Sequence, residues 1–153
     1  MSTLTQNLLV STDFSPASML ALDAAAMLAQ AFTARVTLVH VFDPAPLAPM
    51  ASSQLTSAEQ LEVEQNYERR LHAELERLRD EKLGGIPNVK VALVFGKNAA
   101  ESICRYAEKE KIDLIVIATH GRTGLARMLI GSVAERVVRH ATCPVLTLRS
   151  QLD

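Results

Sequence analysis

Five short apolar runs, separated by segments of helical pattern, constrain the fold of this chain more than any other feature of its sequence. The runs are apolar almost throughout, as strands are when helices cover both faces of a parallel sheet. We therefore predict an α/β fold, with a single open, doubly wound parallel five-stranded sheet and helices on both faces. One domain is expected over residues 1–153. The predicted strands are residues 7–12, 35–42, 88–95, 113–118 and 144–148.

Capping residues mark the starts of the predicted helices. Ser15-Pro16 opens a helix that reaches about residue 32, and Thr56 with Glu59 has the spacing of a capping box. The helix after Thr56 is expected to end at Gly84-Gly85, and further helices are expected from 98 to about 111 and from 132 to 140. Apolar residues at helical spacing are expected to face the sheet. These are Leu20, Ala24, Met27 and Leu28 in the first helix, and Leu61, Leu71, Leu75 and Leu78 in the second.

Composition and charge exclude several classes of protein. The chain is 48% hydrophobic and 22% charged, which is typical of a globular domain, and its net charge is −1. The basic residues are dispersed, so we expect no nucleic-acid partner. Two distant cysteines, Cys104 and Cys143, indicate plain thiols in a reducing compartment rather than a zinc site. Without a signal peptide or a membrane-spanning run, we expect a cytoplasmic protein.

Two segments that follow strands contain the candidate site, because ligands of open parallel sheets bind beyond the carboxyl ends of the strands. The first is Ser11-Thr12-Asp13, and the second begins at Ala118 and continues to Ser132. The glycines of the second segment would let backbone amides approach an anion, Gly131-Ser132 opens a helix, and Arg122 and Arg127 add positive charge. A polyphosphate would suit this segment. Alternatively, Ser132 and Glu135 form only a capping box, and the glycines only serve turns.

Asp13 also has two interpretations. Its carboxylate could accept hydrogen bonds from a ribose or an adenine amine, or it could form an Asx turn into the first helix. His40 lies within the second strand and is interpreted as a packed histidine.

Four separated pieces of the sequence resemble the universal stress protein family. They are Ser11-Thr12-Asp13-Phe14-Ser15, residues 119–124, residues 131–137 and Cys143-Pro144-Val145-Leu146. Members of the ATP-binding branch contain Gly, two residues, Gly, nine residues, and then Gly-Ser or Gly-Thr. Here Gly121 and Gly131-Ser132 fit that pattern, whereas Ala118 replaces the first glycine. Because alanine has the smallest side chain after glycine, we expect a tight but usable site.

The resemblance implies the strand order 3-2-1-4-5 and a site for ATP at the point where this order reverses. It implies that Asp13 and Val41 flank adenine and ribose, with Ser11 and Ile117 nearby. The phosphates, which would carry any Mg²⁺, would be held by His120, Gly121, Arg122, Gly131, Ser132 and Val133 beside Ala118. No metal ligands of the protein itself are expected.

The expected function is regulatory binding of an adenine nucleotide with little or no hydrolysis. Hydrolysis needs a group that positions water, and no Asp, Glu or Gln lies between Asp113 and Glu135. The alternative is a nucleotide-free dimeric interaction protein of the same fold, which the replacement at Ala118 keeps open. A ligase that transfers adenylate is disfavoured because no second substrate domain is visible. In either case we expect a homodimer that pairs through the last strand, about Cys143 to Leu148.

Overall fold

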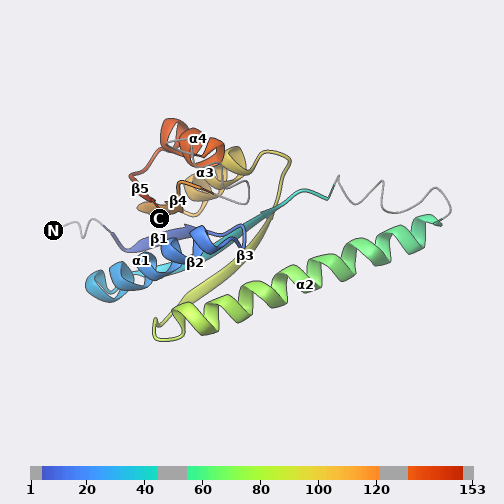
Figure 1. The fold of residues 1–153 in the computed structure, drawn as a ribbon, viewed down its shortest axis with the longest axis horizontal. Helices are drawn as coiled ribbons and strands as arrows, with labels where there is room; N and C mark the ends of the chain where they lie inside the picture. The colour runs from blue at the N-terminus through green and yellow to red at the C-terminus, as the bar shows by residue number, and fades with distance from the viewer. Residues whose placement is uncertain (1–4, 45–54, 121–130, 150–153) are drawn as a thin grey trace.

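A parallel five-stranded sheet forms the centre of the molecule (Figure 1). The computed structural model describes residues 5–44, 55–120 and 131–149. The strand order is β3-β2-β1-β4-β5, so the α/β fold and the order inferred from the resemblance are both confirmed. The strands are β1 (Asn7–Ser11), β2 (Arg35–Phe42), β3 (Val89–Phe95), β4 (Leu114–Ala118) and β5 (Val145–Leu148).

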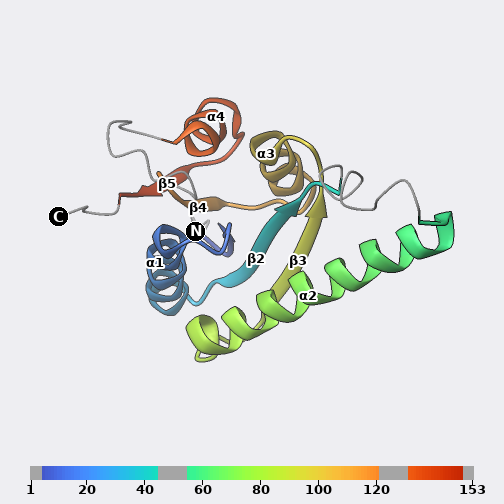
Figure 2. The same ribbon diagram turned by 45° about the vertical axis from the view of Figure 1, so that its right-hand side comes forward.

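The described residues form four helices that cover the sheet, two on each face (Figure 2). On one face, α1 lies against β1 and β4 and α2 lies against β2 and β3. On the other face, α4 lies near β5 and α3 near β2 and β3. The helices are α1 (Pro16–Phe32), α2 (Ser57–Leu83), α3 (Ala99–Lys109) and α4 (Ser132–His140).

The predicted caps of the first three helices are present. The Ser15 side chain accepts a hydrogen bond from the Ser18 amide, and the Asn98 side chain accepts one from the Glu101 amide. Thr56 and Glu59 bond to each other's backbone amides in a complete capping box. Each of these bonds satisfies a donor that the helix itself leaves unpaired.

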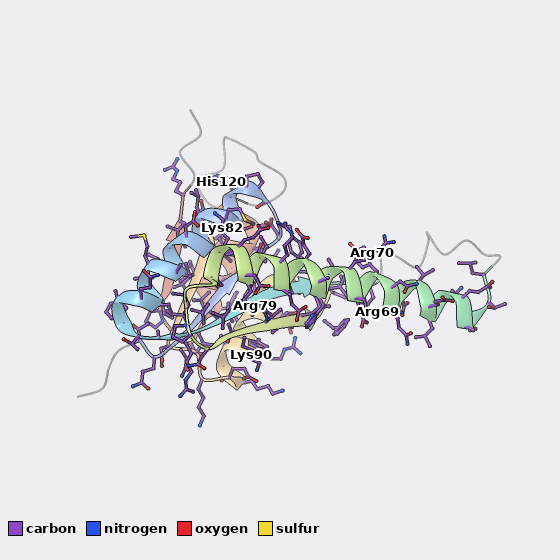
Figure 3. The ribbon with its side chains drawn as sticks, turned by 90° about the horizontal axis from the view of Figure 1, so that it is seen from below. Arg69, Arg70, Arg79, Lys82, Lys90 and His120 are labelled. Atoms are coloured by element: carbon purple, nitrogen blue, oxygen red, sulfur yellow. The ribbon has the colours of Figure 1, made fainter. Side chains whose placement is uncertain are left out.

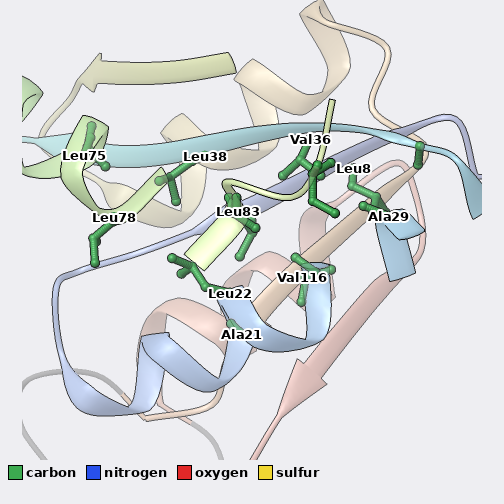
Figure 4. Close-up of a cluster of buried hydrophobic side chains, with 14 residues drawn as sticks. Leu8, Ala21, Leu22, Ala29, Val36, Leu38, Leu75, Leu78, Leu83 and Val116 are labelled. Atoms are coloured by element: carbon green, nitrogen blue, oxygen red, sulfur yellow. The ribbon is translucent and has the colours of Figure 1, made fainter. Parts of the chain in front are cut away.

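The strands bury side chains on both faces, as their apolar runs predicted. Leu8, Val36 and Val116 pack toward α1 and α2 in the cluster of Figure 4. Leu9 and Ile115 point the other way, into a second cluster beneath α3 and α4. No helix within the described ranges is long and apolar enough to cross a membrane.

The predicted core face of α1 was only half right: Ala24 and Leu28 pack partly against the core, but Leu20 and Met27 do not. The helix buries Ser18, Ala21, Leu22, Ala25 and Ala29, whereas Leu20 is 42% exposed and Met27 is 71% exposed. Alanines let the helix approach the sheet closely, so its small-residue face packs inward and a neighbouring apolar face is left outside.

The predicted stripe of α2 holds only for its second half. Leu71, Leu75 and Leu78 are buried, but Leu61 is 54% exposed. No residue of α2 before Leu71 is buried. This half projects beyond the sheet, where Figure 3 shows Arg69 and Arg70, and so it has no core to face.

Candidate functional site

A cavity of about 270 Å³ lies beyond the carboxyl ends of β1, β2 and β4, where the strand order reverses. Nine of the residues predicted for the site line it, and they come from segments far apart in the sequence. They are Ser11, Asp13, Val41, Ile117, Ala118, His120, Gly131, Ser132 and Val133. The other two predicted residues, Gly121 and Arg122, lie outside the described residues, as does Arg127.

Asp13 stands in a tightly bonded loop between β1 and α1. Its Oδ1 accepts a hydrogen bond from the Ser15 amide at 3.0 Å, so the predicted Asx turn is present. The Phe14 amide donates to Thr12 Oγ1 at 3.0 Å, and Thr12 Oγ1 lies 2.9 Å from Ser18 Oγ. Phe14 has a φ of 63°, a left-handed conformation that nonglycine residues adopt only when their surroundings fix it. These contacts hold Asp13 at the rim of the cavity.

His40 connects β2 to the same loop. Its ring is buried, as interpreted from the sequence, and its Nδ1 lies 2.8 Å from the Thr12 carbonyl oxygen. Because a carbonyl can only accept, Nδ1 carries the proton and donates this bond. The ring also packs on Phe14, with centroids 4.5 Å apart, and lines the cavity beside Val41. His40 thus holds the loop between β1 and α1 in place.

The helix α4 opens at the other end of the cavity. Its first intrahelical bond runs from the Glu135 amide to the Gly131 carbonyl oxygen at 2.9 Å. The preceding amides of the first turn, including those of Ser132 and Val133, are the donors that an anion can use. The capping box considered for Ser132 was wrong: Gly131 is the N-cap, none of the described residues caps it through a side chain, and Glu135 pairs with Arg139 at 2.8 Å.

Gly131 is required by the protein backbone itself. A Cβ atom at this position would lie 2.4 Å from the Thr119 carbonyl oxygen, to which the Gly131 amide donates a hydrogen bond. The close approach of these two backbone segments joins the end of β4 to the start of α4. The fold therefore requires glycine at position 131 whether or not a ligand binds.

Ala118 and His120 border this junction. Ala118 packs partly against the cluster beneath α1, on the opposite face from Ile117, and it also contributes to the cavity wall. Its methyl group therefore takes up space mainly on the α1 side, which explains how alanine fits here. His120 is buried, and its Nδ1 lies 3.0 Å from Thr119 Oγ1.

Seven further residues of the cavity wall were not predicted as ligand contacts. They are Thr12, Ser18, His40, Ala99, Ile103, Thr119 and Ala134. Thr12 and Thr119 directly adjoin predicted residues, so the strand-end argument could have included them. Ala99 and Ile103 reach the cavity only because α3 packs over it, and no local pattern signals that.

Asp13 is the only carboxylate among the described residues that line this cavity. No cluster of His, Cys, Asp and Glu suited to a metal ion occurs within the described ranges. A larger hollow of about 840 Å³ lies between α3 and α4, but its wall is charged with both signs. Glu101 and Arg105 pair with each other there at 3.2 Å. The smaller cavity is therefore the stronger candidate, because it combines an apolar wall with polar groups at its two ends.

Comparison with known proteins gives the family of this fold. Residues 5–149 match the model of the universal stress protein family. A universal stress protein of Methanocaldococcus jannaschii is 33% identical over 151 residues, covering 94% of this chain and 82% of that protein.

Solved structures agree with this match. The hypothetical protein MJ0577 superposes with a TM-score of 0.80 at 27% identity, covering 98% of this chain and 99% of that one. A universal stress protein in complex with cAMP superposes with a TM-score of 0.69 at 26% identity, covering 94% and 96% of the two chains. By sequence and by fold, this chain belongs to the universal stress protein family.

Proposed function

We propose that this protein binds an adenine nucleotide, ATP with Mg²⁺ held by its phosphates, as a regulatory module of the stress response. The observation that carries the proposal is the cavity at the switch point, which gathers nine residues expected at such a site. A family member in complex with cAMP supports the ligand class, because cAMP is itself an adenine nucleotide.

The two ends of the cavity suit the two ends of the ligand. Val41, Ile103 and Ile117 offer apolar surface for a base, and the adjacent Asp13 carboxylate can accept from ribose hydroxyls or the adenine amine. A volume of about 270 Å³ is near the lower limit of ligand pockets, so it encloses the nucleoside. The phosphates extend over the first turn of α4 at Ser132 and Val133, where amides and the helix dipole favour negative charge.

The site binds its nucleotide without turning it over efficiently. Attack on the γ-phosphate needs a group that orients water, and Asp13 is the only described carboxylate in the wall. Its Oδ1 is engaged in the turn at the end of the cavity where we place the nucleoside rather than the phosphates. Hydrolysis is therefore absent or very slow. The free thiols Cys104 and Cys143 fit our proposal of a cytoplasmic location.

Calorimetry with adenosine, AMP and Mg²⁺-ATP tests the two ends separately. Asp13→Asn should weaken the binding of all three ligands by the same factor, about tenfold or more, because it removes a charged acceptor at the nucleoside end. Ser132→Glu should weaken the binding of ATP strongly and that of adenosine hardly at all, since it places negative charge where we expect the phosphates. Asp23→Asn is the control, because Asp23 is exposed and pairs with Lys82 on the outside of the helices.

Three outcomes would contradict parts of the proposal. Equal affinity for adenosine and ATP would show that the phosphates are not held at α4. Phosphate release at or above about 1 per second, lost in Asp13→Asn, would make the protein an enzyme. Absence of any nucleotide, both in calorimetry and in native mass spectrometry of the purified protein, would favour the alternative of a nucleotide-free interaction protein.

We also propose that the protein is a homodimer in which two copies of β5 pair antiparallel. β5 lies at the end of the sheet, so one side of its backbone ladder lacks a neighbouring strand of the described sheet. Strand edges are usually guarded by charges, yet no charged residue occurs between Ala141 and Leu148. The opposite edge, β3, carries Lys90, which pairs with Glu110 at 3.1 Å.

A further inference from the structure

The two cysteines of this chain lie in the same part of the molecule, although they are far apart in the sequence. Cys104 is in the middle of α3, and Cys143 lies between the end of α4 and the start of β5. Both pack against one hydrophobic cluster, which is the cluster beneath α3 and α4. These two helices contact each other, and Figure 2 shows them side by side on the same face of the sheet. The fold therefore brings both thiols under neighbouring helices.

The hollow between α3 and α4 shows how the two cysteines face each other. Cys104 lines this hollow of about 840 Å³ together with Arg139 and His140, so it lies on the side of α3 that is turned toward α4. Thr142, the direct neighbour of Cys143, lines the same hollow. Cys143 and Cys104 are each half-buried, and both are free thiols in this structure. The pair is thus a reduced dithiol that small solutes can reach.

The electrostatics of the two thiols agree with their being close. Burial raises the pKa of the Cys143 thiol, and the neighbouring Cys104 and Asp113 raise it further. An effect of one side chain on another in this partly exposed position requires a short separation, because salt screens charges that lie more than about 8 Å apart.

We propose that Cys104 and Cys143 form a modification site, which a hydroperoxide oxidises to an intramolecular disulfide. This site is separate from the nucleotide cavity, and its chemistry requires neither a nucleotide nor a dimer. Cytosolic disulfides of this kind are usually transient and serve to sense oxidants.

The reaction takes place in two balanced steps. The Cys104 thiolate, which lines the open hollow, attacks one oxygen of the peroxide, the O–O bond breaks, and the leaving hydroxide takes up the proton that the thiol released. This step gives a sulfenic acid and one water. The Cys143 thiolate then attacks the sulfenic sulfur, the S–O bond breaks, and a second water leaves. Two thiols and one hydrogen peroxide thus give one disulfide and two waters, and a dithiol reductant reverses the oxidation by exchange.

The thiol pKa values set the rate of the first step. Burial raises the pKa of the Cys104 thiol above the ordinary cysteine value, and only the thiolate is nucleophilic. A small fraction of Cys104 is therefore ionised near neutral pH, and oxidation is slow. The pair stays reduced under ordinary reducing conditions and responds to a sustained excess of peroxide.

A disulfide at this place would join elements that the fold already holds together. It would link α3 to the segment before β5 and close a loop of about 40 residues, from 104 to 143. A bond that closes such a loop restricts the unfolded chain and, if it fits the native structure, should raise the melting temperature by about 5–15 °C. A bond that distorted the structure would lose this gain.

Peptide mass spectrometry of peroxide-treated protein tests the proposal. Native wild-type protein is treated with hydrogen peroxide, alkylated, and digested with trypsin without reduction. The peptides 98–105 and 140–149 should appear joined, and dithiothreitol should separate them. The melting temperature before and after dithiothreitol isolates the effect of the disulfide, since this reagent leaves methionine sulfoxide in place. Cys104→Ser and Cys143→Ser each remove one partner, so each should abolish both the joined peptides and the change in melting temperature.

Several results would overturn the proposal. Two thiols that stay unreacted in a lasting excess of peroxide would do so, as would separate sulfinic or sulfonic acids on the two cysteines without joined peptides. A cross-link between two chains, seen as a dimer on a nonreducing gel, would show that the cysteines react with another copy instead. Joined peptides without a higher melting temperature would show that the fold does not hold the two thiols in position. None of these measurements depends on whether ATP binds.

Discussion

Replacing His40 with phenylalanine tests how the loop that carries Asp13 is held. The variant keeps an aromatic ring beside Phe14 but removes the donor that lies 2.8 Å from the Thr12 carbonyl oxygen. Thr12 is only 5% exposed, so water cannot readily replace that donor. Leaving a buried acceptor without this donor costs about 1–2 kcal/mol. For a domain of this size, the melting temperature should fall by about 2–8 °C.

The change in nucleotide affinity should reflect the same loss of free energy in the loop. If the loop leaves its position in the variant, binding has to restore it, and the affinity falls by the fraction of molecules that remain competent. A loss of 1–2 kcal/mol therefore corresponds to at most about 5–30-fold weaker binding, by the same factor for adenosine and ATP.

His40→Asn is the matched comparison for His40→Phe. The asparagine amide nitrogen occupies about the place of Nδ1 and can donate to the Thr12 oxygen, while the ring that packs on Phe14 is lost. We expect Asn to retain more affinity than Phe, even if its melting temperature is similar. Thermal unfolding and calorimetry would be run on both variants. The reasoning fails if the Phe variant melts and binds like the wild type, or if Asn binds more weakly than Phe.

Three further predictions address the core, the junction at Gly131 and the thiols. Leu75→Ala should lower the free energy of unfolding by about 2–5 kcal/mol in urea titrations, whereas Leu61→Ala should change it by less than about 0.5 kcal/mol, since only Leu75 is buried. Gly131→Ala should lower the melting temperature as well as nucleotide affinity, because the added Cβ meets the Thr119 carbonyl; an unchanged melting temperature would return Gly131 to a purely ligand-related role. Burial raises the pKa of both the Cys104 and Cys143 thiols above the ordinary cysteine value. The folded protein therefore holds these protons more tightly than the unfolded chain, and its stability should decrease as pH rises above the unfolded thiol pKa, a decrease that Cys104→Ala with Cys143→Ala should abolish.

The order and type of the elements could be predicted because each strand is apolar throughout and each of the first three helices begins at a capping residue. The orientation of α1 could not be predicted, although its apolar periodicity does indicate a helix. Periodicity locates an apolar stripe, but it does not distinguish a face of Ala21, Ala25 and Ala29 that packs on the sheet from a face of Leu20 and Met27 that lies outside. Close packing favoured the small residues, against the larger hydrophobic area of the other face. The exposed half of α2 escaped prediction for a related reason: helix signals do not reveal where the sheet beneath the helix ends.

The residues gathered at the site could be predicted from two sources of different strength. The rule that ligands bind beyond strand ends selected the segments after β1 and β4, and the family resemblance selected individual residues within them. Neither source could predict the contacts that hold the loop of Asp13 in place. The bond between His40 and Thr12 joins positions 28 residues apart, and the contact of Ile103 with the cavity depends on how α3 packs over the sheet. Such contacts arise from tertiary structure and leave no local pattern in the sequence.

The two interpretations of Asp13, as a turn residue and as a ligand for the nucleoside, prove to be compatible. The turn uses Oδ1, which accepts from the Ser15 amide at 3.0 Å, and a carboxylate has a second oxygen with its own acceptor sites. The turn therefore fixes the orientation of the carboxylate at the rim of the cavity before any nucleotide arrives, and a group held in place loses less conformational entropy on binding. Asparagine at this position can form the same turn through its side-chain oxygen, so Asp13→Asn removes the charge and little of the loop structure. For that reason a loss of nucleotide affinity in this variant, at an unchanged melting temperature, would be evidence about the ligand rather than about the fold.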